Sequence, residues 1–131
     1  MKTSIHIEGE LLKAELAGTF ALADAMDSFR QVVESIAVHH PRIVLMDARN
    51  VAGHIGPVER FRYGEFVAKE THSLPERGVL PMPRFAYVLA PDVIDPERVG
   101  ETAAVNRGMM VKAFTDLHEA LNWLGSSTPP R

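Results

Sequence analysis

Residues 42–47 (RIVLMD) constrain the fold more strongly than any other stretch. Four consecutive apolar residues lie between an arginine and a carboxylate. A strand that is apolar on both of its faces is typical of the middle of a parallel sheet covered by helices on each side. We therefore expect an α/β fold built around this strand, with Asp47 at its carboxyl end.

The chain before this strand predicts a β-hairpin and then an amphipathic helix. Apolar and polar residues alternate over residues 5–8 and 12–16, with Gly9 between them, as in two strands joined by a short turn. Apolar residues then recur at helical spacing over residues 22–36. Because Pro41 disfavours a helical conformation at the residue before it, we expect this helix to end near His39 and His40.

The chain after the strand alternates helices with strands. A loop at 51–56 precedes Pro57, which suits the first position of a helix, and three prolines exclude a regular element from residues 73–83. The remaining predicted elements are a strand at 84–90 beside the first buried strand, a helix from Pro96 to Arg107 with Asp95 as its N-cap and Gly108 as its end, a strand at 109–114 and a helix at 117–124.

This order predicts the fold class and the domain boundary. Parallel strands need crossover connections, so the fold is α/β with a mainly parallel five-stranded sheet, an N-terminal β-hairpin and four helices. We expect one domain over residues 1–125. Residues 126–131 contain too little apolar surface to pack, and we expect a flexible C-terminal tail there.

Composition argues against several classes of function. Seventeen acidic and fourteen basic residues give a net charge of −3 without a basic cluster, so we expect no nucleic-acid partner. The chain has no cysteine, which excludes disulfides and thiolate chemistry. It also has no apolar run near the roughly 20 residues of a membrane span. We expect a cytoplasmic protein with no transmembrane segment.

Motifs for metal binding or catalysis are absent from the sequence. The six histidines form no i, i+4 pair on a predicted helix, and no serine lies in a Gly-x-Ser-x-Gly elbow. Residues 53–56 (GHIG) resemble a phosphate loop in position but lack the Gly-Lys-Ser/Thr ending, which favours a flexible turn. We therefore predict neither an enzyme nor a bound metal or cofactor.

A candidate binding site follows from the topology, because doubly wound sheets place their crevice beyond the carboxyl ends of the strands. The polar residues expected there are Asp47, Arg49, His54, Arg60 and Arg107. In one interpretation Asp47 pairs with a nearby arginine and serves only the structure.

In the other interpretation this site binds a ligand. Arg49 and Arg107 would then hold a carboxylate or phosphate, while Val51, Ile55 and Phe61 would receive an apolar group.

Four segments of the chain carry a resemblance to a known family: 45–49 (LMDAR), 104–108 (AVNRG), 111–116 (VKAFTD) and 119–124 (EALNWL). They resemble the SpoIIAA-like family, which is related in fold to the STAS anti-anti-sigma domains and the CRAL-TRIO lipid carriers. The resemblance spans residues 4–124 and implies a small βα superhelical sandwich. A STAS phosphoswitch carries Ser or Thr at the start of the helix after the central strand, whereas neither occurs here between Asp47 and Glu70.

Three functional hypotheses result. The first is a non-enzymatic binding or interaction module whose partner is an apolar or weakly anionic small molecule, or a lipid-like ligand. The alternative is a regulatory protein-docking domain of STAS type without the phosphorylatable residue, and a small hydrolase comes third.

We also expect a homodimer, because the chain has more large apolar side chains than one small sheet can cover. These side chains are Phe61, Tyr63, Phe66, Met109 and Met110.

Overall fold

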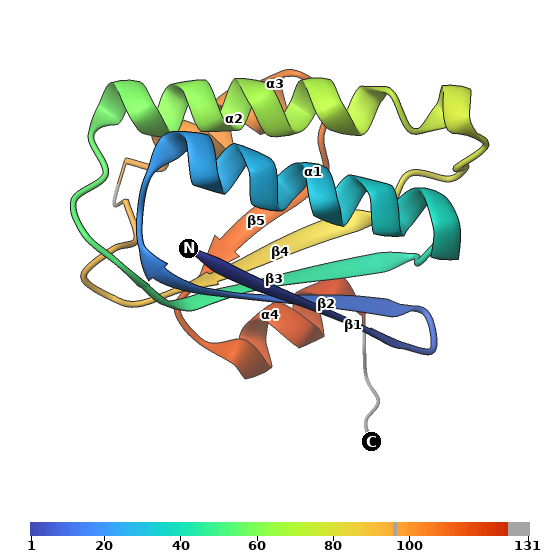
Figure 1. The fold of residues 1–131 in the computed structure, drawn as a ribbon, viewed down its shortest axis with the longest axis horizontal. Coiled ribbons are helices and arrows are strands. Elements are labelled where there is room, and N and C mark those ends of the chain that lie inside the picture. The colour runs from blue at the N-terminus through green and yellow to red at the C-terminus, as the bar shows by residue number, and fades with distance from the viewer. Residues whose placement is uncertain (96, 126–131) are drawn as a thin grey trace.

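Helices cover both faces of a five-stranded sheet (Figure 1). The computed structural model describes residues 1–95 and 97–125, so the predicted tail at 126–131 lies outside the described residues. The strands lie in the order β1-β2-β3-β4-β5, with β1 antiparallel to β2 and every other pair parallel. This arrangement confirms the predicted mainly parallel sheet with an N-terminal hairpin.

The element order also matches the prediction, with one additional short 3₁₀ helix. The elements are β1 (Lys2–Glu8), β2 (Leu11–Thr19), α1 (Leu22–His39), β3 (Ile43–Ala52), α2 (Pro57–His72), η1 (Pro75–Arg77), β4 (Arg84–Leu89), α3 (Val99–Asn106), β5 (Val111–Phe114) and α4 (Leu117–Leu124).

The strand order explains the layers of the molecule. Helices α1, α2 and α3 each connect one parallel strand to its immediate neighbour, always in the same direction across the sheet. Because such crossovers are right-handed, they place all three helices on one face. Helix α4 follows the last strand and packs on the opposite face (Figure 1).

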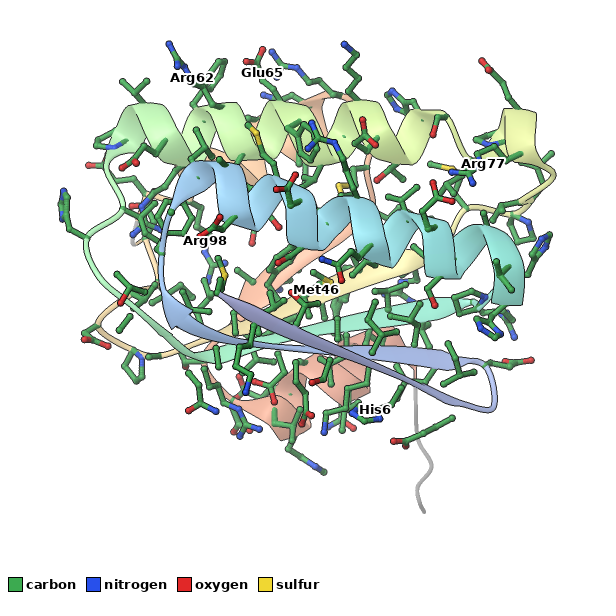
Figure 2. All side chains as sticks on the ribbon, in the orientation of Figure 1. His6, Met46, Arg62, Glu65, Arg77 and Arg98 are labelled. Atoms are coloured by element: carbon green, nitrogen blue, oxygen red, sulfur yellow. The ribbon has the colours of Figure 1, made fainter. Side chains whose placement is uncertain are left out.

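The larger core lies between the sheet and the three crossover helices. Phe29 of α1 is fully buried at its centre, and its ring contacts the rings of Tyr63, Phe66 and Phe85 at centroid distances of 6.5, 6.4 and 5.8 Å. Met46 of β3 points into the same layer (Figure 2). The helical periodicity of α1 therefore predicts its buried face correctly.

The smaller core lies under α4. Leu45 of β3 and two residues of β4 pack against Ala120 and Leu124 of this helix. Trp123 contacts Phe114 with a centroid distance of 5.9 Å. Successive residues of β3 thus point into different cores, as expected for a strand that is buried on both faces.

Strand β3 is longer than predicted, because it continues past Asp47 to Ala52. Between Asp47 and Asn50 it advances three residues while β2 advances only two, from Glu15 to Ala17. This register shift is a β-bulge, which places one extra residue in β3. Val51 consequently points back into the larger core, although Arg49 and Asn50 are both exposed.

Helix α3 begins later than predicted, at Val99 rather than Pro96. Arg98 adopts the left-handed conformation with φ +53°, so a helix cannot run through it. Asp95 instead caps the segment from a distance, since its carboxylate accepts hydrogen bonds from the backbone N–H groups of Glu97 and Val99. Gly108, at φ +92°, ends the helix as predicted.

Helices α2 and α3 approach each other through two glycines. A side chain at Gly64 would collide with the carbonyl oxygen of Gly100, and a Cβ atom at Gly100 would lie 2.8 Å from the carbonyl oxygen of Arg60. The close approach explains why the interior of α2 contains a glycine, which costs about 1 kcal/mol relative to alanine in an exposed helix.

We therefore expect Gly64→Ala to destabilise the protein, despite the better helix propensity of alanine. The overpacked helix contact should lower the free energy of unfolding by about 1–3 kcal/mol. Chemical denaturation monitored by circular dichroism measures this change. Gly56→Ser at the N-cap of α2 is the matched control and should stay within about 0.5 kcal/mol of wild type. An unchanged midpoint for Gly64→Ala would contradict the proposed tight contact.

Candidate functional site

An apolar cavity of about 140 Å³ lies between the sheet and helices α1, α2 and α3. Residues near the carboxyl ends of all four parallel strands line it, including Leu16 of β2, Ala48 of β3, Leu89 of β4 and Ala113 of β5. Ligands of doubly wound folds bind at this edge of the sheet. The position of the cavity therefore makes it the first candidate for a binding site.

Two tyrosines contribute hydroxyl groups to the lining of this cavity. The hydroxyl oxygens of Tyr63 from α2 and Tyr87 from β4 lie 2.6 Å apart, within hydrogen-bond distance. Their rings form an edge-to-face pair with centroids 6.1 Å apart. A phenol with its ordinary pKa of about 10 is already protonated at neutral pH, and desolvation raises the pKa of both tyrosines further.

Two arginines at the rim of the cavity tie neighbouring segments together. Arg60 donates hydrogen bonds to the carbonyl oxygens of Ile55 and Val93, at 3.0 and 2.7 Å. Arg98 donates to the carboxylate of Glu101 and to the carbonyl oxygen of Ala113, at 2.8 and 3.0 Å. These bonds fix the loops around the cavity and engage both guanidinium groups.

Asp47 and Arg49 form a bidentate ion pair on the face of the sheet opposite the cavity. Arg49 donates from Nε and Nη2 to the two carboxylate oxygens of Asp47, at 2.9 and 2.7 Å. Asp47 points to the same side of β3 as Leu45, toward the layer of α4, and its side chain is only 8% exposed. The guanidinium lowers the pKa of Asp47, with a smaller contribution from the backbone N–H of Arg49.

The five residues predicted for the site do not form one cluster. Only Arg60 lines the cavity, and His54 is exposed in the loop between β3 and α2. Arg107 lies on the outer surface of the helical layer, where it donates to the carboxylate of Glu65 at 2.7 Å. Asp47 and Arg49 lie on the opposite face of the sheet. The expected juxtaposition of Arg49 with Arg107 is therefore wrong.

The apolar part of the predicted site is partly correct. Val51 and Ile55 both line the cavity. Phe61 does not, because it points outward from α2 and is 41% exposed under the guanidinium of Arg107. Within one turn of α2, Phe61 faces the outside whereas Tyr63 faces the cavity. The apolar residues of α2 recur too irregularly for the sequence to separate these two faces.

Sequence reasoning missed the tyrosine pair. Tyr87 interrupts the otherwise apolar residues 85–89, which could have marked it as a half-buried polar group. Its partner Tyr63 is 24 residues away in the chain. Their contact depends on how α2 crosses β4, and no local pattern encodes that geometry.

Metal-binding clusters and membrane-spanning helices are both absent from the described part of the chain. Within residues 1–95 and 97–125, no group of three or more His, Asp or Glu side chains is arranged to hold a metal ion. No helix in these ranges has both the length and the apolar character needed to cross a lipid bilayer.

Comparison with solved structures shows the fold. The chain is similar to an anti-sigma factor antagonist from Mycobacterium paratuberculosis, with a TM-score of 0.58 and 14% sequence identity. The match covers 95% of this chain and 94% of that one. No family model matches the sequence, and no curated protein is similar to it at the level of sequence. The likeness confirms the fold that the resemblance to SpoIIAA-like proteins implied.

The Asp47–Arg49 pair predicts a loss of stability on mutation. Arg49→Ala should lower the free energy of unfolding at pH 7 by about 1–2 kcal/mol, less than for a fully buried pair because the Arg49 side chain is 46% exposed. Arg49→Lys keeps the charge but loses the paired geometry, so an intermediate loss is expected.

The same pair predicts a pH dependence. The folded state lowers the pKa of Asp47, so its contribution is complete above the ordinary carboxyl pKa of about 4 and is lost as the pH falls through the folded value. The difference between wild type and Arg49→Ala should therefore shrink in acid. Urea unfolding at pH 7 and at lower pH tests this, and a constant difference would contradict it.

Proposed function

We propose that this chain is a non-enzymatic regulatory domain that docks onto an anti-sigma factor. The observation that carries the proposal is the likeness to an anti-sigma factor antagonist, which extends over nearly the whole length of both chains. On this proposal, the part of the chain that acts is a surface on which an anti-sigma factor can dock. Among the described residues, a surface suited to docking lies at the start of α2.

The proposed docking segment comprises residues 52–62, which form the end of β3, the following loop and the first turns of α2. Val58 and Phe61 are 64% and 41% exposed, although both are large and apolar. His54 and Arg62 are exposed beside them, and Arg62 points away from the sheet (Figure 2). Exposed apolar side chains with an arginine and other polar side chains beside them are typical of the centre and rim of a protein interface.

Docking by this segment would not depend on phosphorylation of Ser or Thr. Neither residue occurs between Asp47 and Glu70, and α2 begins with Gly56 and Pro57. A carboxylate already occupies the first turn, since Glu59 accepts a hydrogen bond from the backbone N–H of Gly56 at 3.0 Å. Negative charge stabilises this end of a helix. We infer that the docking surface is permanently available.

The geometry favours this function over the other hypotheses. An anionic ligand held by Arg49 and Arg107 loses support, because those guanidinium groups bond to Asp47 and Glu65. For a hydrolase, Ser28 bonds to Thr3 and Ser73 bonds to the carbonyl oxygen of Glu70, so neither hydroxyl is aligned with a base.

A homodimer remains a prediction. Of the five side chains that motivated it, Met109 is buried and the rings of Tyr63 and Phe66 pack against the larger core. Phe61 and Met110 stay exposed, at 41% and 49%. The exposed apolar surface is therefore smaller than the sequence suggested. Light scattering at micromolar concentration would contradict the dimer if it gave the monomer mass of 14.5 kDa.

Binding to purified anti-sigma factors of the source organism tests the proposed function. We expect Val58→Asp and Phe61→Asp each to weaken the complex by roughly tenfold or more, because a buried carboxylate would replace an apolar contact. Isothermal titration calorimetry measures this loss, and circular dichroism verifies that the variants fold.

Val38→Asp is the matched control. Val38 is 73% exposed at the far end of α1, away from the start of α2 (Figure 1). Its substitution should leave the affinity unchanged. Absence of binding to every anti-sigma factor tested would contradict the function, whereas equal losses for Val38→Asp and Phe61→Asp would contradict the location of the surface.

A further inference from the structure

We propose that the cavity between the sheet and helices α1–α3 binds an uncharged, ring-sized apolar molecule that carries one hydrogen-bond acceptor. Ile55 and Arg60 of the docking segment contribute to the lining of this cavity, whereas the exposed Val58 and Phe61 of that segment do not. The inference does not depend on the proposed docking function. It follows from the volume of the cavity, its apolar walls and the two tyrosines inside it.

The volume sets the size of the ligand. The cavity measures about 140 Å³, and an apolar protein cavity of about 150 Å³ holds benzene. Side chains such as Val51, Val67, Leu89 and Val111 form its walls. A single six-membered ring with a short substituent would fill this space and bury its apolar surface, which stabilises the complex by the hydrophobic effect.

The tyrosine pair supplies the hydrogen-bond donor. Two protonated hydroxyl groups carry two hydrogens, and the 2.6 Å bond between Tyr63 and Tyr87 uses only one of them. The remaining hydrogen belongs to whichever hydroxyl accepts that bond, and the described residues offer it no further partner. Because both tyrosines line the cavity, an acceptor atom on the ligand can receive it.

The surroundings select against a charged ligand. Both phenols stay neutral, since burial raises a pKa that is ordinarily about 10 already. The rim guanidinium groups of Arg60 and Arg98 are engaged by carbonyl oxygens and by Glu101. The lining also contains the carboxylates of Asp95 and Glu101, and the terminal ammonium group of Met1 lies 3.7 Å from the carboxylate of Asp24. A carboxylate inside the cavity would therefore lose its hydration and meet cations whose charge nearby carboxylates already balance, which is unfavourable. The ligand class is a neutral aromatic or cyclic ketone, aldehyde or ether.

Three probes of equal size test the proposal on the intact protein. Acetophenone has a carbonyl acceptor, isopropylbenzene has the same shape without an acceptor, and benzoate has the same shape with a negative charge. We expect both neutral probes to raise the melting temperature and benzoate to leave it unchanged. In NMR titrations, the amide signals of Val67 and Leu89 should shift, whereas that of Ala120 under the opposite face should not.

The double variant Tyr63→Phe/Tyr87→Phe isolates the hydrogen bond. Replacing both partners by apolar groups of the same shape leaves stability nearly unchanged. The affinity for acetophenone relative to isopropylbenzene should then fall roughly two- to tenfold, the range of one neutral hydrogen bond. An unchanged ratio would overturn the role of the tyrosines. Failure of both neutral probes to bind wild type, or shifts confined to α4, would overturn the site.

Discussion

Strand β3 has two faces that must both be covered, and this requirement determines the arrangement of the whole molecule. Val44 and Met46 point toward α1–α3, whereas Leu45 points toward α4. A three-helix layer covers only one side, so helix α4, which follows the last strand, packs on the other. Helix α4 is short, and beyond its reach the second face continues with the Asp47–Arg49 ion pair. An ion pair thus covers the part of this face that α4 does not reach.

The cavity results from the way the helical layer meets the edge of the sheet. Gly64 and Gly100 let the backbones of α2 and α3 approach closely. Near the same edge, small side chains such as Ala25, Ala48 and Ala104 face each other across the layer. Three alanines around one space leave volume that larger residues would fill. Small residues therefore explain both features: glycines allow the close contact between α2 and α3, and alanines leave the cavity beside it.

Local patterns determined most of the elements, and long-range contacts determined the parts that the sequence did not reveal. The hairpin and α1 follow from alternation and helical spacing over neighbouring residues. The late start of α3 depends on Arg98, which has a left-handed backbone and donates a hydrogen bond to the carbonyl oxygen of Ala113 in β5. For the candidate site, the pairing of Asp47 with an arginine two residues away was predictable. The placement of Arg107 on the far side of the helical layer required knowledge of the helix crossing.

The bulge in β3 has a consequence for comparing this chain with its structural relatives. Before the bulge, even-numbered residues such as Val44 and Met46 face the three-helix layer, whereas after it the odd-numbered Val51 does. A related strand without the extra residue would keep one parity throughout. Aligning the two without a gap would match inward positions with outward ones from residue 49 onward. Buried positions of one strand would then be aligned with exposed positions of the other, and the two sequences would look unrelated although their backbones superpose.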